Sequence, residues 1–128
     1  MSGSQHSPTQ SMPSENTARI LQTLAHNIGL AHQFVEGHTA DSFASDERTI
    51  YAVTRCLEII SEASRRLPNE IKTRYPAVPW TQIAGSGNVY RHDYEDVLAS
   101  LLWNTVHKHL DELEQAVRTE LIRQTTER

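Results

Sequence analysis

The sequence predicts an all-α protein, and three observations point to that fold class. Apolar residues recur every three or four positions over long stretches, as they do on one face of an α-helix. No stretch alternates apolar and polar residues, and no Asn-Gly hairpin turn occurs. Residues that end helices, Gly37 and Pro68, separate the periodic stretches. These features predict a bundle of four main helices plus a short helix.

The domain is expected over residues 15–123. Residues 1–14 hold five serines and two prolines, a composition that buries too little apolar surface to offset the entropy lost on ordering. We therefore expect a disordered N-terminal tail over 1–14. Residues 124–128 are expected to be a frayed C-terminus.

The first two main helices have the clearest periodicity. The first is expected from Glu15, after the N-cap Ser14, to Gly37, and the second from Ser45 or Asp46 to Pro68, with a loop between them. The stripe of the first comprises Ile20, Leu24, Ile28, Ala31 and Val35. That of the second comprises Ile50, Val53, Leu57, Ile60, Ser64 and Leu67. The near-heptad spacing of the second stripe suits packing at a shallow angle against a partner helix.

The second half of the chain is expected to hold the short helix and two further main helices. Residues 69–75 can form the short helix, and Pro79 is a favoured first residue for the next one. The last helix is expected over residues 95–123. Glycines in helices cost stability, so Gly29 predicts close packing of a neighbour. Gly85 and Gly87 predict close backbone approach by another helix, another subunit or a ligand.

The amino-acid composition and the charge balance exclude some classes of function. The chain has 12 Lys and Arg against 16 Asp and Glu, a net charge of −4, which argues against a broad basic surface for duplex DNA. A local basic cluster for RNA stays compatible with that balance. The one cysteine, Cys56, cannot form an internal disulfide and is interpreted as a small buried filler. With no membrane-spanning run and no secretory signal, a cytoplasmic location is predicted.

The seven histidines do not have the spacing of a metal site. His107 and His109 are two residues apart, so on a helix they point to opposite sides. His26 and His32 are six apart, about 240° around a helix, so they do not share a face. We therefore predict no metal site and no cofactor. The run Gly85-Ser86-Gly87 follows no strand and does not predict a phosphate-binding loop.

The segment around His92 carries the best candidate chemistry. Asn88 and His92 are four residues apart and share a helix face with Gly85. An imidazole can move a proton near neutral pH, and the Arg91 guanidinium can bind phosphate oxygens, so a phosphodiester is a credible ligand. The alternative interpretation is that these side chains are exposed on a helix that merely packs tightly.

Several blocks of this sequence resemble the HepT-like family of HEPN-fold toxins. Residues 52–63 read AVTRCLEIISEA, residues 79–85 read PWTQIAG, and residues 102–106 read LWNTV. Asn88 and the run His92-Asp93-Tyr94 lie between the last two blocks, in the family order. The similarity covers residues 17–118.

The resemblance implies a fold, an activity and a partner. The fold would be a HEPN-like bundle, as a homodimer with its cleft across the two-fold axis. The activity would be metal-independent ribonuclease cleavage, in a type VII toxin–antitoxin module of bacteria, with Arg91 and His92 as catalytic residues and Asn88 as a binding residue. The partner would be a minimal nucleotidyltransferase antitoxin that silences the toxin by adding AMP to Tyr94.

One position departs from the family pattern. The family motif has an arginine just before Asn88, where this chain has Gly87. Either Arg91 makes the phosphate contact in its place, or the protein is a catalytically weak or inactive HEPN binding module that pairs with the nucleotidyltransferase. Loss of one charged contact to a transition state costs about 3 kcal/mol, on the order of a hundredfold in rate.

Overall fold

The computed structural model describes residues 8–86 and 95–126. The expected all-α fold is confirmed, because every regular element of these residues is helical. The main ones are α1 (Pro8–Val35), α3 (Glu47–Arg66), α6 (Glu95–Asn104) and α7 (Leu110–Thr126). A short π-helical turn (Thr105–His109) joins α6 to α7, and α2 (Ala40–Ala44), α4 (Asn69–Arg74) and α5 (Trp80–Ser86) are short.

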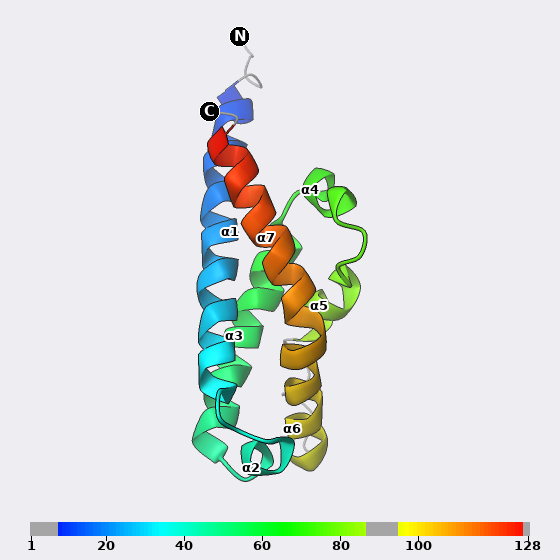
Figure 1. Cartoon of the computed structure of the whole chain (residues 1–128). Coiled ribbons are helices and arrows are strands. Elements are labelled where there is room, and N and C mark those ends of the chain that lie inside the picture. Colours follow the sequence, from blue (N-terminus) through cyan, green and yellow to red (C-terminus); the bar gives the residue numbers. More distant parts are fainter. Residues whose placement is uncertain (1–7, 87–94, 127–128) are drawn as a thin grey trace.

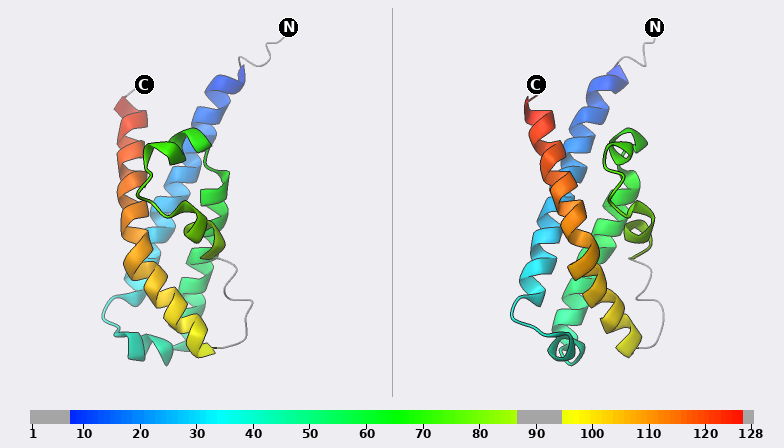
Figure 2. Two further views of the ribbon diagram at one scale, coloured as in Figure 1. Left: turned by 90° about the vertical axis from the view of Figure 1, so that its right-hand side faces the viewer. Right: turned by 45° about the vertical axis from the view of Figure 1, so that its right-hand side comes forward.

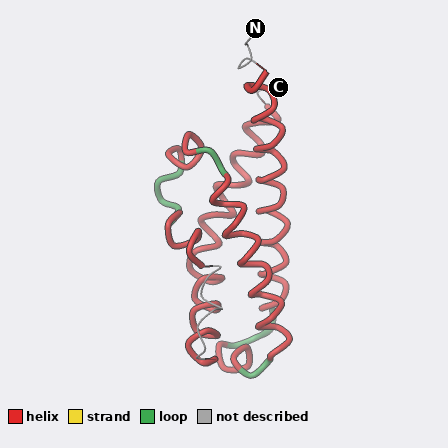
Figure 3. The backbone as a smooth tube through the Cα atoms, turned by 180° about the vertical axis from the view of Figure 1, so that it is seen from behind, coloured by secondary structure: helices red, strands yellow, loops and turns green. Residues whose placement is uncertain are grey.

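The long helices run alongside one another as an elongated bundle (Figure 1). Helix α2 lies across the end of the bundle opposite the start of α1 and the end of α7, and α4 and α5 lie against its side (Figures 1 and 2). The backbone tube shows helices joined by short loops (Figure 3). No helix in the described ranges is long and apolar enough to cross a membrane.

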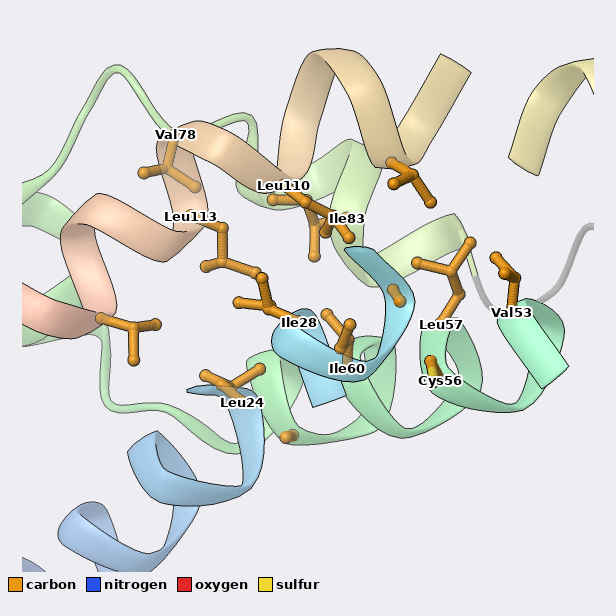
Figure 4. Close-up of a cluster of buried hydrophobic side chains, with 14 of the residues drawn as sticks. Leu24, Ile28, Val53, Cys56, Leu57, Ile60, Val78, Ile83, Leu110 and Leu113 are labelled. Atoms are coloured by element: carbon orange, nitrogen blue, oxygen red, sulfur yellow. The ribbon is translucent and has the colours of Figure 1, made fainter. Parts of the chain in front are cut away.

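The core lies where α1, α3 and the α6–α7 segment meet (Figure 4). Every residue of the predicted first stripe is buried, and so is every residue of the second except the half-buried Ile50. The best-shielded side chains come from all three helices and include Leu24, Ile28, Leu57, Ile60, Leu110 and Leu113. Cys56 is also buried, as predicted, and burial raises the pKa of its thiol, which disfavours a nucleophilic role.

The ends of the domain differ from the sequence-based expectation. Helix α1 begins at Pro8, inside the segment expected to be disordered, where proline suits a first turn that leaves its N–H groups unbonded. Helix α7 continues to Thr126, past the expected end at residue 123. There the hydroxyls of Thr125 and Thr126 donate to the carbonyls of Leu121 and Ile122. Residues 1–7, 127 and 128 lie outside the described part of the chain.

Helix α2 occupies the segment that was expected to be a loop. Thr39 and Ser42 form a capping box: each side chain accepts a hydrogen bond from the other residue's backbone N–H. Phe43 is fully buried and packs on Trp103 of α6, with ring centroids 5.4 Å apart. The next helix, α3, begins after Asp46, one of its two predicted N-caps, whose carboxylate accepts from the Thr49 N–H.

The predicted last helix is interrupted by the π-helical turn. Leu102, Val106 and Leu110 are all buried at intervals of four residues. In a regular α-helix, two such steps drift about 80° around the axis. The wider π turn offsets this drift, so all three side chains stay on the core face.

Candidate functional site

The predicted site residues Asn88, Arg91, His92 and Tyr94, together with Gly87, lie outside the described residues. The structure does describe the elements on both sides of them. Helix α5 ends at Ser86, and α6 begins at Glu95.

The C-terminal end of α5 is fastened to α3 by side chains. The Ala84 carbonyl accepts hydrogen bonds from the Ser61 hydroxyl and the Arg65 guanidinium. Arg65 also donates to Ser61 Oγ (2.9 Å) and Glu62 Oε1 (3.0 Å), so its guanidinium is held on three sides. The last carbonyls of a helix lack hydrogen-bond partners within the helix. A cation at this end also interacts favourably with the negative end of the helix dipole. This contact holds the last turn of α5, which leads into the candidate segment.

The start of α5 is equally well held. The Trp80 indole N–H is shared between the carbonyls of Lys72 and Tyr75, at 3.1 Å from each. Ile83 is fully buried in the core. A shallow groove of about 450 Å³ lies beside these residues, lined by Asn69, Lys72, Thr73, Trp80, Thr81 and Ala84. Lys72 Nζ lies 6.0 Å from the centre of the Trp80 ring. Lys72 and Arg65 are thus a local pair of cations around α5.

The α6 side is organised by aromatic rings. Trp103 packs between Phe43 of α2 and His107 of the π-helical turn, whose ring centroid lies 4.0 Å away. His107 Nδ1 also lies 2.8 Å from the Trp103 carbonyl oxygen. Ala99 and Leu102 bury the inner face of α6. Helix α6 is therefore anchored independently of α5, through α2 and the core.

A buried ion pair joins α4 to α7. Glu120 is 1% exposed, and its carboxylate accepts from Arg74 Nη2 (3.0 Å) and from the Tyr75 hydroxyl (2.9 Å). Burial by itself raises the pKa of Glu120, but the hydrogen bonds from Arg74 and Tyr75 outweigh it and leave that pKa below its ordinary value. Burial and the bond to Glu120 raise the pKa of Tyr75. The pair positions α4, which leads into α5.

The structure also brings together three groups of the metal-ligating kind that the sequence spacing did not reveal. They are His32 on α1 and Asp111 and Glu114 on α7, whose ligand atoms all lie within 4.8 Å of one another. His32 and the two carboxylates lie far apart in the sequence, so spacing along a single helix does not indicate that they meet. Asp111 and Glu114 are three residues apart and share a face of α7. This spacing is the sequence signal that indicates the two carboxylates of the group.

Gly29 of α1 and Gly85 of α5 have no close neighbours among the described residues. A Cβ atom placed on Gly29 or Gly85 would have nothing within 4 Å among the described residues. The expectation of a close neighbour at Gly29 is therefore wrong for the described residues. At Gly85 no other described helix comes close, and approach by another subunit or a ligand stays a prediction. Gly87 lies outside the described ranges.

Comparison with known proteins assigns the family. Residues 24–120 match the family described as Ribonuclease HepT-like. The chain is similar to Probable ribonuclease HepT of Thermococcus cleftensis, with 36% identity over 73% of this chain and 84% of that protein. It is also similar to proteins named as RNases from Caldanaerobacter subterraneus (37% identity, 66% of this chain and 75% of that protein) and Methanocaldococcus jannaschii (30% identity, 84% and 92%). No solved structure gives a significant match. The chain belongs to the HepT-like family.

Proposed function

We propose that this HepT-like chain is an endoribonuclease, the toxin of a bacterial type VII toxin–antitoxin module, which cleaves RNA without a metal ion in a cleft between two copies. The observation that carries this proposal is the family match over residues 24–120, since that range contains α5, α6 and the candidate segment between them. Relatives that bear ribonuclease names match over most of their own length.

The chemistry needs a base, an acid and a stabilised anion. The ribose 2′-hydroxyl attacks the adjacent phosphorus as a base removes its proton, and the P–O5′ bond breaks as an acid protonates the leaving oxygen. The products are a 2′,3′-cyclic phosphate and a 5′-hydroxyl. His92 is proposed as the base or the acid, and Arg91 as the group that stabilises the charge on the phosphoryl oxygens.

The described elements around α5 support this assignment in two ways. Ser61 and Arg65 hold the end of α5, so the segment that follows starts from a fixed point on α3. Proximity and orientation raise the rate of a reaction when rigid structural elements hold the reacting groups in place. Lys72 also places a positive charge beside α5 in a chain of net charge −4, while the charge of Arg65 is offset by its ion pair with Glu62. A local cation of this kind favours an anionic substrate.

The regulation proposed for the chain follows from the same chemistry. A minimal nucleotidyltransferase partner transfers AMP to the Tyr94 hydroxyl, two residues after His92, and releases pyrophosphate from ATP. The added phosphodiester carries negative charge and bulk beside the imidazole, so it repels the RNA phosphate and occupies its place. A cytoplasmic location and a homodimer belong to this proposal.

A second function is favoured by one observation in the sequence. Gly87 stands where the family motif has arginine, so one cation is missing from the expected set. In that case the chain is a HEPN module that binds its nucleotidyltransferase partner, and possesses little or no cleavage activity.

An RNA cleavage assay in the presence of a chelator distinguishes the two functions. The first predicts cleavage by the parent chain, a loss of a hundredfold or more in His92→Ala and Arg91→Ala, and no change in His26→Ala, a control at an exposed histidine of α1. If the parent and His92→Ala are equally inactive, while the partner still forms a stable complex, the binding module is the correct function. Equal cleavage by both would show that His92 is not catalytic.

A further inference from the structure

Three side chains on the α1–α7 face form a cluster that the proposed ribonuclease chemistry does not use. His32 lies near the end of α1, and Asp111 and Glu114 lie in the first turns of α7. His32 Nε2 is 3.6 Å from Asp111 Oδ1 and 3.8 Å from Glu114 Oε1. Two neighbouring helices of the bundle therefore direct one imidazole nitrogen and two carboxylate oxygens toward a common point.

The imidazole nitrogen at this point has no hydrogen-bond partner. His32 Nε2 is shielded from solvent, and it is the one buried side-chain nitrogen or oxygen without such a partner in residues whose side chains are described. Both carboxylate oxygens are too distant to accept a hydrogen bond from it. A buried polar atom left without a hydrogen bond is costly. A cation at the common point would remove that cost.

The spacing fits a small, four-coordinate metal ion. Zinc bonds to imidazole nitrogen and carboxylate oxygen at about 2.0–2.2 Å, which places the ligand atoms of a tetrahedron about 3.4 Å apart. The two His32 distances exceed that value by only a few tenths of an ångström. Magnesium would demand octahedral oxygen ligands about 3.0 Å apart and does not favour an imidazole.

A neighbouring arginine orients one of the three side chains, and the exposure of another lets an ion reach the cluster. Arg118 Nη2 binds Glu114 Oε2 at 3.3 Å, so the other oxygen, Oε1, is the one that faces His32. Contacts of this outer kind fix the direction of a metal ligand. The Asp111 side chain is 65% exposed, so an ion and its remaining water can reach the cluster from solvent.

We propose that His32, Asp111 and Glu114 bind a divalent transition-metal ion, with zinc as the best fit, and that water completes its coordination. The bound ion would join α1 to α7, helices that come from opposite ends of the chain. Its role is structural, because none of its ligands belongs to α5, α6 or the segment between them. Cleavage of RNA in a chelator is therefore compatible with this site.

The test is thermal unfolding of the full-length chain after metal removal, with ZnCl₂ or MgCl₂ added. At a concentration of about one hundred times its dissociation constant, zinc is expected to raise the melting temperature by roughly 5–10 °C, and magnesium is expected to leave it unchanged. His32→Gln and Asp111→Asn should abolish the shift. His38→Gln is the matched control, because His38 Nε2 faces only one carboxylate, Asp46, at 3.6 Å, and this variant should keep the shift.

A second readout does not depend on stability. Cobalt in a tetrahedral site of nitrogen and oxygen ligands absorbs visible light strongly, so a cobalt titration of the parent should give a saturable band that is absent in His32→Gln. Either of two results would overturn the proposal: no response of the parent to zinc and cobalt, or equal responses in the parent and His32→Gln. The first of these would leave the cluster as a polar contact between α1 and α7.

Discussion

The buried contact between Arg74 and Glu120 offers a sharp test of how α4 is held to α7. Replacing Arg74 by alanine removes one partner of the Glu120 carboxylate, which is 1% exposed in the intact protein and also accepts a hydrogen bond from the Tyr75 hydroxyl. Breaking a buried pair in this way costs about 3–5 kcal/mol when the stranded charge has no other compensation. Here Arg74 is itself 30% exposed, so water can enter its place, and Arg123 also lowers the pKa of Glu120. We therefore expect Arg74→Ala to lower the free energy of unfolding by about 2–3 kcal/mol.

The measurement is urea unfolding of the single and double variants. Glu120→Gln removes the charge but keeps the shape of the side chain, so it should cost about 1–2 kcal/mol. In the double variant no carboxylate is stranded, so its cost should fall below the sum of the two single costs by about 1 kcal/mol or more. Arg55→Ala is the matched control, because Arg55 is 71% exposed and its pair with Glu58 should contribute less than about 0.5 kcal/mol. Additive costs, or an Arg74→Ala cost no larger than that of Arg55→Ala, would refute the reasoning.

Three further predictions concern pH, a helix glycine and the end of α5. Because the pKa of Glu120 is lowered by folding, its contribution to stability is complete above the unfolded value of 4.5 and is lost as the pH falls through the folded value. The parent should therefore lose more stability than Glu120→Gln between pH 5 and 3 in acid titrations followed by circular dichroism, and parallel curves would contradict this. Gly29→Ala should raise the free energy of unfolding by about 1 kcal/mol, since a methyl group there meets open space; a loss in urea unfolding would show a hidden neighbour. If the ribonuclease proposal holds, Arg65→Ala should reduce the cleavage rate roughly tenfold by loosening α5, with partial rescue in Arg65→Lys and none of this effect in Arg55→Ala. Unchanged cleavage in Arg65→Ala would remove Arg65 as a positioning residue.

Periodicity predicted the packed faces well, because burial on a helix depends on neighbours three and four residues apart. The stripe from Ile20 to Val35 is buried throughout, and so is nearly all of the stripe from Ile50 to Leu67. Short elements escaped this reasoning. Helix α2 has one buried residue, Phe43, and is too short for a period to appear, and Ser42 stands where the usual capping-box signature has Glu or Gln.

Contacts between distant segments were the part that sequence reasoning could not supply. Nothing local to Glu120 indicates that its carboxylate meets Arg74 and Tyr75, more than forty residues earlier in the chain. The same holds for His32 and the carboxylates of α7. The residues proposed for catalysis, Arg91 and His92, were identified from spacing and family resemblance, and their arrangement stays a prediction.

The π-helical turn at Thr105–His109 accommodates one residue more than a regular α-helix would hold over the same rotation. Deleting one residue from it would let a continuous α-helix form, in which the positions of Leu102 and Leu110 are seven residues apart and about 700°, close to two full turns, around the axis. Leu113 and Val117 would then stay in the core, and Asp111 and Glu114 would stay near His32. A single-residue deletion between residues 105 and 109 should therefore be far less damaging than one in the middle of α3, where every later residue of the helix would rotate by about 100°.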